Sequence, residues 1–171
     1  MHDTSQTPAP QRTTHYAGAG LILTRLDGGM IRFLLLRGRE GGIWSFSKGR
    51  PEACDQRKPL CTAVRETQEE TGLVNEQDYM IFGHSIRFGK RPYWVAVVRP
   101  EAVSNLRLSQ REHDAAGWFT WAEIEHLTTN TDVRAWTKKT GPATAFQALI
   151  SSVLCSSIGS KHWTVGEYTV S

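Results

Sequence analysis

The chain has 171 residues, of which 39% are hydrophobic and 22% are charged, and its formal net charge is +3. This length fits a single globular domain with a substantial core, and the apolar fraction excludes a largely disordered chain. No stretch approaches the roughly 18 consecutive apolar residues of a membrane-spanning helix, so we expect no membrane partner.

Three cysteines, Cys54, Cys61 and Cys155, are odd in number and follow no metal-binding spacing. The N-terminus also lacks the apolar segment of a signal peptide. We therefore expect reduced thiols in a cytoplasmic protein. Residues 1–15 are polar and contain two prolines. We expect them to form a flexible tail, followed by one domain over residues 16–158 and a C-terminal tail over residues 159–171.

The domain is expected to begin with two apolar strands, over Ala17–Arg25 and Ile31–Gly38. The segment Asp27-Gly28-Gly29 lies between them, and Asp-Gly between apolar runs is typical of a β-hairpin turn. A loop with several glycines follows the second strand.

An acidic helix is predicted next. Pro59 suits its first turn, and Gly72 suits the left-handed position that ends a helix. Apolar residues at helical spacing predict a buried face made of Leu60, Ala63, Val64 and Thr67.

Glu66, Glu69 and Glu70 fall within an arc of about 100° on the opposite side of this helix. Like charges at this spacing oppose helix formation by a few tenths of a kcal/mol per pair. Three oxygen ligands on one face, with no basic residue between them, are what Mg²⁺ or Mn²⁺ needs. The alternative is an ordinary solvated helix face, because such acidic clusters are common there.

Further elements are predicted after the helix. Tyr79–Phe88 and Tyr93–Arg99 read as paired strands that turn at residues 89–92, and Ala115–Trp121 reads as another short strand. Helices are expected over Trp121–Leu127 and Pro142–Ser157.

The helix and the loop before it resemble the Nudix box. That motif runs Gly, five residues, Glu, seven residues, then Arg-Glu-apolar-x-Glu-Glu-x-Gly-apolar. Here Gly49 is followed by five residues, Asp55, nine residues and then Arg65-Glu66-Thr67-Gln68-Glu69-Glu70-Thr71-Gly72-Leu73. The departures are the aspartate, two extra loop residues, and Thr67 in the apolar position.

Within the Nudix hydrolase superfamily, the chain is most similar to the asymmetrical diadenosine tetraphosphate hydrolases. The likeness covers roughly residues 17 to 128. The segments that carry it, besides the box, are Trp44-Ser45-Phe46-Ser47-Lys48-Gly49, Tyr93-Trp94-Val95-Ala96-Val97-Val98, Arg107-Leu108-Ser109, Glu112-His113 and Trp118.

This resemblance implies an α/β fold, a Nudix-type α/β/α sandwich with a mixed β-sheet. It also implies Mg²⁺ (or Mn²⁺) as cofactor. The metal ligands it implies are Glu66, Glu69, Glu70, the backbone carbonyl of Lys48, and Glu112 as a fourth carboxylate. The alternative for Glu112 is a solvated glutamate in a turn. Asp55 and Arg65 are expected to brace the loop, and Glu66 is our choice of general base.

The substrate-binding candidates are Lys48, Arg50, Phe88, Tyr93 and His113. Lys48 and Arg50 can meet phosphate oxygens. By resemblance, Phe88 or Tyr93 stacks on adenine, and the alternative for both is packing in the sheet. His113 either contacts phosphate or is a surface residue.

Together these residues predict a monomeric, Mg²⁺-dependent pyrophosphohydrolase with a small-molecule nucleotide substrate. The leading case is diadenosine tetraphosphate, cleaved to ATP and AMP. An RNA 5′ pyrophosphohydrolase or decapping enzyme is the nearest alternative, with RNA as partner. A Nudix domain that binds nucleotide without turnover is the third. ADP-ribose and inositol pyrophosphates remain open as substrates.

Overall fold

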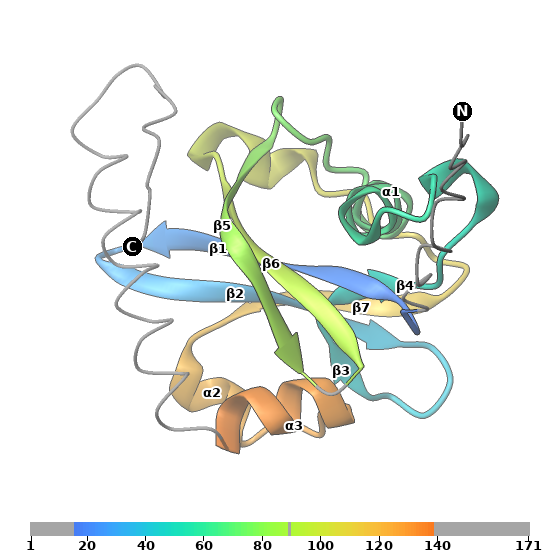
Figure 1. The fold of residues 1–171 in the computed structure, drawn as a ribbon. Helices are drawn as coiled ribbons and strands as arrows, with labels where there is room; N and C mark the ends of the chain where they lie inside the picture. Colours follow the sequence, from blue (N-terminus) through green and yellow to red (C-terminus); the bar gives the residue numbers. More distant parts are fainter. Residues whose placement is uncertain (1–15, 89, 139–171) are drawn as a thin grey trace, which may run out of the picture.

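The computed structural model of the chain describes residues 16–88 and 90–138. Its centre is a seven-stranded sheet in which β3-β2-β1-β6-β5 are neighbours, while β4 also pairs with β1 and β7 with β2 (Figure 1). The strands are β1 (Ala19–Asp27), β2 (Met30–Gly38), β3 (Trp44–Ser45), β4 (Ser47–Gly49), β5 (Tyr79–Phe88), β6 (Arg91–Val98) and β7 (His113–Phe119).

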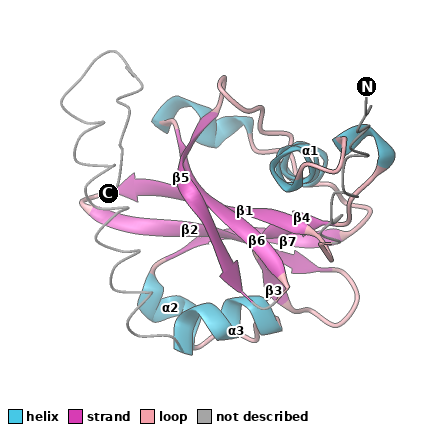
Figure 2. Ribbon diagram, in the orientation of Figure 1, coloured by secondary structure: helices cyan, strands magenta, loops and turns pink. Residues whose placement is uncertain are grey.

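The sheet is mixed and has helices on both faces. β1 and β6 run parallel, whereas all other pairs are antiparallel. Helix α1 (Pro59–Thr71) lies over one face, and α2 (Trp121–Glu125) and α3 (Thr131–Lys138) lie under the other (Figures 1 and 2). Two short 3₁₀ turns, Ala53–Asp55 and Pro100–Asn105, complete the elements. This arrangement confirms the predicted α/β/α sandwich.

Each face of the sheet buries its own hydrophobic cluster, as expected for a three-layer sandwich. On the face of α1, Ala63 and Leu73 pack against strand residues such as Leu21 and Leu34. On the other face, Val133 and Trp136 of α3 join a separate cluster. Since strand side chains alternate between faces, neighbouring residues of one strand serve different layers.

Helix α1 has the ends that its sequence predicts. Pro59 occupies the first turn, and Gly72 ends the helix in the left-handed region at φ 72°, where a side chain is costly. The predicted apolar stripe is wrong in part, because Leu60 is 38% exposed. Hydroxyl side chains with buried hydrogen-bond partners, those of Thr62 and Thr67, share the packed face with Ala63.

Other boundaries differ modestly from the predictions. The first hairpin turns at Gly28-Gly29, with Asp27 opposite Met30. β6 starts at Arg91, two residues earlier than predicted, and Arg91 pairs with Phe88 of β5. β3, β4 and α3 were not predicted. The helix expected over Pro142–Ser157, both tails and Cys155 lie outside the described residues.

Cys54 and Cys61 are exposed free thiols. Among the described residues, no helix combines the length and the hydropathy that crossing a membrane requires.

Candidate functional site

Strand β4, which carries Gly49 of the glycine-containing loop, packs against helix α1. Because strand residues alternate, Ser47 and Gly49 face α1. The hydroxyls of Ser47 and Thr67 lie 3.0 Å apart and are buried. A Cβ atom at Gly49 would lie 1.8 Å from the carboxyl carbon of Glu66. Glycine is therefore needed at this position so that Glu66 can lie directly on the β4 backbone.

Lys48, between these two residues, meets the site through its backbone. Its N–H donates to Oε2 of Glu70 at 3.1 Å. Its side chain leaves on the opposite face of the sheet, since a Cβ at Gly20 would approach both the Lys48 Cβ and the Tyr93 ring. The backbone of Lys48 thus lies at the acidic face of α1, which agrees with a role for its carbonyl there. That role stays a prediction.

The three glutamates of α1 have unlike surroundings. The side chain of Glu69 is 57% exposed, that of Glu66 is 14% exposed and that of Glu70 is 6% exposed. The three carboxylates of the predicted acidic face are therefore not equivalent, because β4 and His113 cover that of Glu70.

Arg65 balances part of this negative charge. Its Nη1 lies 3.0 Å from Oε1 of Glu66 and 2.9 Å from Oε2 of Glu69. Although no basic residue lies between the glutamates in the sequence, Arg65 just before them thus pairs with two of the three. The signal was in the sequence, because Arg65 precedes Glu69 by four residues, the spacing of helical ion pairs.

The guanidinium of Arg65 also binds Asp55 in the loop before α1, as predicted. Nε and Nη2 of Arg65 donate to the two oxygens of Asp55 at 3.0 and 3.1 Å. The hydrogen bonds from Arg65 hold the pKa of the buried Asp55 carboxyl well below its ordinary value. Gln56 and Arg57 follow with φ of 52° and 59°. These two left-handed residues turn the loop back toward α1. The contact between Asp55 and Arg65 therefore forms although the loop is two residues longer than in the motif.

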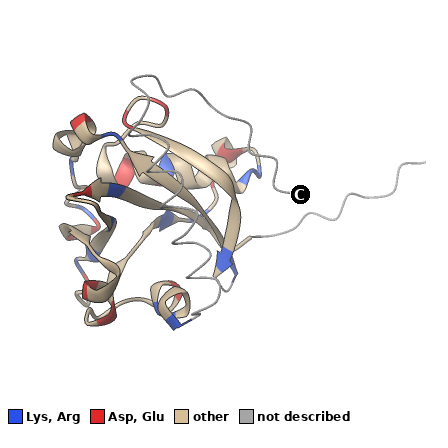
Figure 3. Cartoon of the chain, turned by 90° about the vertical axis from the view of Figure 1, so that its left-hand side faces the viewer, with Lys and Arg blue, Asp and Glu red and all other residues tan. Residues whose placement is uncertain are grey.

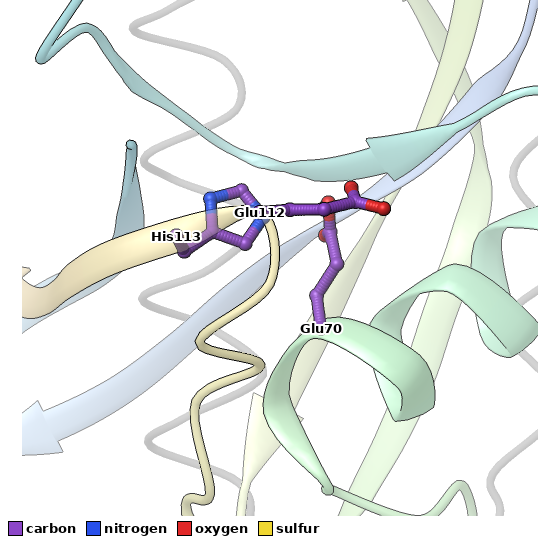
Figure 4. Close-up of side chains that lie close together, drawn as sticks. All are labelled: Glu70, Glu112 and His113. Atoms are coloured by element: carbon purple, nitrogen blue, oxygen red, sulfur yellow. The ribbon is translucent and has the colours of Figure 1, made fainter. Parts of the chain in front are cut away.

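A second group of ligand atoms lies at the C-terminal end of α1. Glu70 rises from the helix toward Glu112 and His113, which come from the segment that leads into β7 (Figure 4). One ligand atom from each of these residues lies within 4.8 Å of the others. Nε2 of His113 is 3.0 Å from Oε1 of Glu70.

Backbone hydrogen bonds fix that segment to the helix. Arg107 N–H donates to the carbonyl of Thr71 at 2.7 Å, and Ser109 N–H donates to that of Glu70 at 2.9 Å. These carbonyls belong to the last turn of α1, where no intrahelical donor remains. On the other side, Arg39 N–H donates to the carbonyl of Glu112 at 2.9 Å. Glu112 is therefore held beside α1 although its side chain is exposed.

This set of donors fits a hard divalent cation. Carboxylate and carbonyl oxygens are the ligands that Mg²⁺ and Mn²⁺ prefer. The predicted ligands offer such oxygens from three segments: Glu66, Glu69 and Glu70 on α1, Lys48 on β4 and Glu112 before β7. Burial raises the pKa of Glu66, against the opposing effect of Arg65, and the charges of Glu70 and Glu69 raise it further. Crowded carboxylates of this kind gain from a cation that offsets their repulsion.

The two aromatic substrate candidates are not available for stacking. Phe88 and Tyr93 are almost wholly buried in the cluster under α3. The hydroxyl of Tyr93 donates to Oδ2 of Asp132 at 2.6 Å, and Arg91 reaches the same oxygen at 3.2 Å. The structure thus corrects the stacking prediction in favour of packing in the sheet.

Two further substrate-binding candidates, Arg50 and His113, have different surroundings. Arg50 is exposed beside the helix, and its carbonyl accepts from Nη2 of Arg65 at 2.8 Å. His113 is 7% exposed and in contact with Glu70, so it is not a surface residue. Sequence reasoning missed the contact of His113 with Glu70. The pairing of these residues depends on how the segment before β7 folds, which no local pattern reveals.

Comparisons with known proteins agree with this geometry. The NUDIX domain model matches residues 14–140. The asymmetrical bis(5'-nucleosyl)-tetraphosphatase of Rattus norvegicus is 33% identical over 123 residues, which cover 67% of this chain and 81% of the rat protein. The protein of that description from Sus scrofa is 34% identical over the same shares.

A solved structure gives the same picture of the fold. The C. elegans Ap4A hydrolase in a binary complex superposes with a TM-score of 0.59 at 23% identity. The match covers 78% of this chain and 98% of that one. The family model covers most of the chain, so the chain belongs to the NUDIX domain family.

Proposed function

We propose that this protein is a Mg²⁺-dependent hydrolase of dinucleoside polyphosphates that cleaves diadenosine tetraphosphate to ATP and AMP. One observation carries the hydrolytic part. Carboxylates from α1 and from the segment before β7 converge with the β4 backbone on one small region. The substrate part is supported by the 33–34% identity to proteins described as asymmetrical tetraphosphatases.

In this proposal Glu66, Glu69, Glu70, Glu112 and the Lys48 carbonyl hold the cation. When bound, a divalent cation neutralises phosphate charge and makes the attacking water more acidic. The protein itself fixes the geometry. Arg65 and Asp55 brace the loop that carries Gly49 and Lys48, and the hydrogen bonds of Glu70 hold its carboxylate in one orientation.

Glu66 is the residue that we assign as general base. A base works best when its pKa approaches the working pH, and burial moves the pKa of Glu66 in that direction. Its carboxylate also lies against the Gly49 backbone and beside Glu70. It is therefore both fixed in place and next to the other proposed cation ligands, where the attacking water would be oriented.

Lys48 and Arg50 are proposed to meet the phosphates of the substrate. They flank Gly49 on β4 and the loop after it. The Lys48 side chain starts on the face opposite α1, away from the carboxylates, so for Lys48 the proposal rests on the resemblance alone. Elsewhere in the described part of the chain, acidic and basic residues are interspersed (Figure 3), which favours a small polyanion over a long nucleic acid.

A product assay tests the proposal. Diadenosine tetraphosphate, triphosphorylated and capped RNA, ADP-ribose and an inositol pyrophosphate are each incubated with the protein and Mg²⁺ in ¹⁸O-labelled water. We expect diadenosine tetraphosphate to be turned over best, giving AMP and ATP with the label in one of them. The Glu69→Gln variant is the matched control for contaminating hydrolases, because Glu69 is exposed and its loss should spare the fold.

Each other outcome has a defined meaning. Two molecules of ADP would show central cleavage and contradict the asymmetric assignment. A clear preference for RNA would promote an RNA 5′ pyrophosphohydrolase, and its binding should then weaken steeply with salt. Binding without turnover of any substrate would favour a non-catalytic nucleotide-binding domain.

A further inference from the structure

We propose that His113 is a positioning residue that fixes the carboxylate of Glu70 for cation binding, and that it does not contact substrate phosphate. This inference rests on the proposed function, because it takes Glu70 to be a cation ligand. The observation behind it is the contact of 3.0 Å between Nε2 of His113 and Oε1 of Glu70, both residues being buried.

Glu70 is held at both of its oxygens. Oε1 faces His113, and Oε2 accepts the backbone N–H of Lys48 at 3.1 Å. Each carboxylate oxygen has two lone pairs, so one remains on each oxygen for a cation. Glu69 differs, because the contact of its carboxylate is with the exposed end of Arg65. Two donors from separate strands therefore give Glu70 a single orientation.

The position of His113 depends on the same helix end that carries Glu70. His113 N–H donates to the carbonyl of Ser109 at 3.1 Å, and Ser109 N–H donates to the carbonyl of Glu70 at 2.9 Å. Ser109 thus binds the backbone of Glu70, and His113, four residues later, contacts the Glu70 side chain. His113 also pairs with Gly38 in the sheet. Both ends of the contact are therefore fixed, which is what a positioning residue requires.

The hydrogen-bonding pattern of the ring assigns its role. An ionised carboxylate only accepts, so Nε2 must carry the hydrogen. Nδ1 is buried and has no hydrogen-bond partner among the described residues. The ring nitrogen that faces Glu70 is thus already used as a donor, and the other is shielded from solvent. Neither ring nitrogen is therefore available to a phosphate group. A histidine that orients a metal-binding carboxylate needs only the donor at Nε2.

Mn²⁺ binding by electron paramagnetic resonance tests this inference without any turnover. His113→Leu fills the space but removes the donor, whereas the amide of His113→Gln can donate from nearly the position of Nε2. We expect Mn²⁺ to bind His113→Leu about 10- to 100-fold more weakly than the wild type. His113→Gln should restore most of the affinity. His84→Leu, at an exposed histidine of β5, is the matched control and should bind as the wild type does.

Three results would overturn the inference. One is wild-type Mn²⁺ affinity in His113→Leu. The second is a His113→Gln variant that binds 10-fold or more weakly than the wild type, which also decides the matter if His113→Leu does not fold. The third is a spin-echo signal from nitrogen bonded directly to Mn²⁺, because His113 would then be a ligand. Absence of Mn²⁺ binding in the wild type would instead contradict the proposed function itself.

Discussion

The three glutamates within five residues of α1 differ in burial and in hydrogen-bond partners. Glu69 is mostly exposed and pairs with Arg65, whereas Glu70 is buried and accepts hydrogen bonds from a backbone N–H and an imidazole. A buried carboxylate that is hydrogen-bonded on both oxygens is part of the folded structure. An exposed one contributes little to stability.

Stability measurements on two matched variants should show this difference. We expect Glu69→Gln to change the free energy of unfolding by less than about 0.5 kcal/mol. Glu70→Gln should lower it by roughly 1–3 kcal/mol, because the new amide group places a donor against the N–H of Lys48 or of His113. Urea denaturation of both variants measures this. Equal effects of the two substitutions would contradict the environments described for them.

Asp55 is a second buried carboxylate whose partners determine its role. Arg65 donates to both of its oxygens, and the Thr62 hydroxyl and the Glu52 N–H donate to one of them. The pKa of Asp55 is therefore far below its ordinary value of 3.8, chiefly because of the hydrogen bonds from Arg65. The folded state thus binds fewer protons at this site than the unfolded state does.

This shift predicts a pH dependence of stability. A carboxyl with a lowered folded-state pKa contributes stability that is complete above its unfolded pKa and is lost as the pH falls through its folded pKa. We expect Asp55→Asn to lower the free energy of unfolding by roughly 3 kcal/mol at neutral pH. The difference from the wild type should narrow as the pH falls below about 4.

Urea denaturation over a series of pH values measures that difference. Asp27→Asn is the matched control, because Asp27 forms ion pairs with Arg25 and Arg32 but is about half exposed. Its effect should be much smaller at every pH. A cost of Asp55→Asn that stayed constant down to low pH would show that the pairing with Arg65 does not depend on the charge of Asp55.

At the scale of elements, the contact between β4 and α1 places the glycine loop on the acidic helix. Thr67 stands where the Nudix box has an apolar residue, and its hydroxyl meets that of Ser47 in a buried contact. The polar residue that replaces an apolar one in α1, Thr67, thus has a polar partner in β4, Ser47. Because Ser47 precedes Lys48, this contact also fixes the N–H that Glu70 accepts.

A double-mutant cycle tests this coupling. Ser47→Ala and Thr67→Val should each lower the free energy of unfolding by about 1–2 kcal/mol, because each leaves a buried hydroxyl with a poorer partner. The double variant should cost clearly less than the sum. Ser104→Ala, at an exposed serine, combined with Thr67→Val should be additive. Additivity in the first cycle would show that the two hydroxyls are independent.

Local patterns explain which elements the sequence predicts well. Helix α1 carries its own start and stop residues, Pro59 and Gly72, and the first hairpin carries its own turn. β3 and β4 were missed because two- and three-residue strands have no periodicity to detect. Leu60 was misplaced because the hydroxyls of Thr62 and Thr67, which hydrophobic patterns ignore, contribute to the buried face of α1 through hydrogen bonds to Asp55 and Ser47.

At the scale of the whole molecule, the sheet separates two tasks. One face carries α1 and the carboxylates, and the other packs α2 and α3 over an aromatic cluster. The box motif predicts helix α1 and its brace to Asp55 on the first face, but neither the exposure of Leu60 nor the contact of His113 with Glu70. The second face could not be predicted in detail, because Phe88 and Tyr93 look alike as sheet residues or as base-stacking residues. Their partners in the folded chain distinguish the two roles: Phe88 packs against the ring of Tyr93, and the Tyr93 hydroxyl donates to Asp132.

The proposed function requires both a cation and the α1 carboxylates, since Lys48 and Arg50 together carry too little positive charge to offset that of four phosphates. The most direct test is the rate of diadenosine tetraphosphate hydrolysis with Mg²⁺, with excess EDTA, and after Mg²⁺ is restored. We expect the wild-type rate to fall to background in EDTA and to recover fully. Glu69→Gln should stay folded and lose orders of magnitude in kcat at any Mg²⁺ concentration. Undiminished turnover in EDTA, or a Glu69→Gln variant as fast as the wild type, would contradict the metal site on α1.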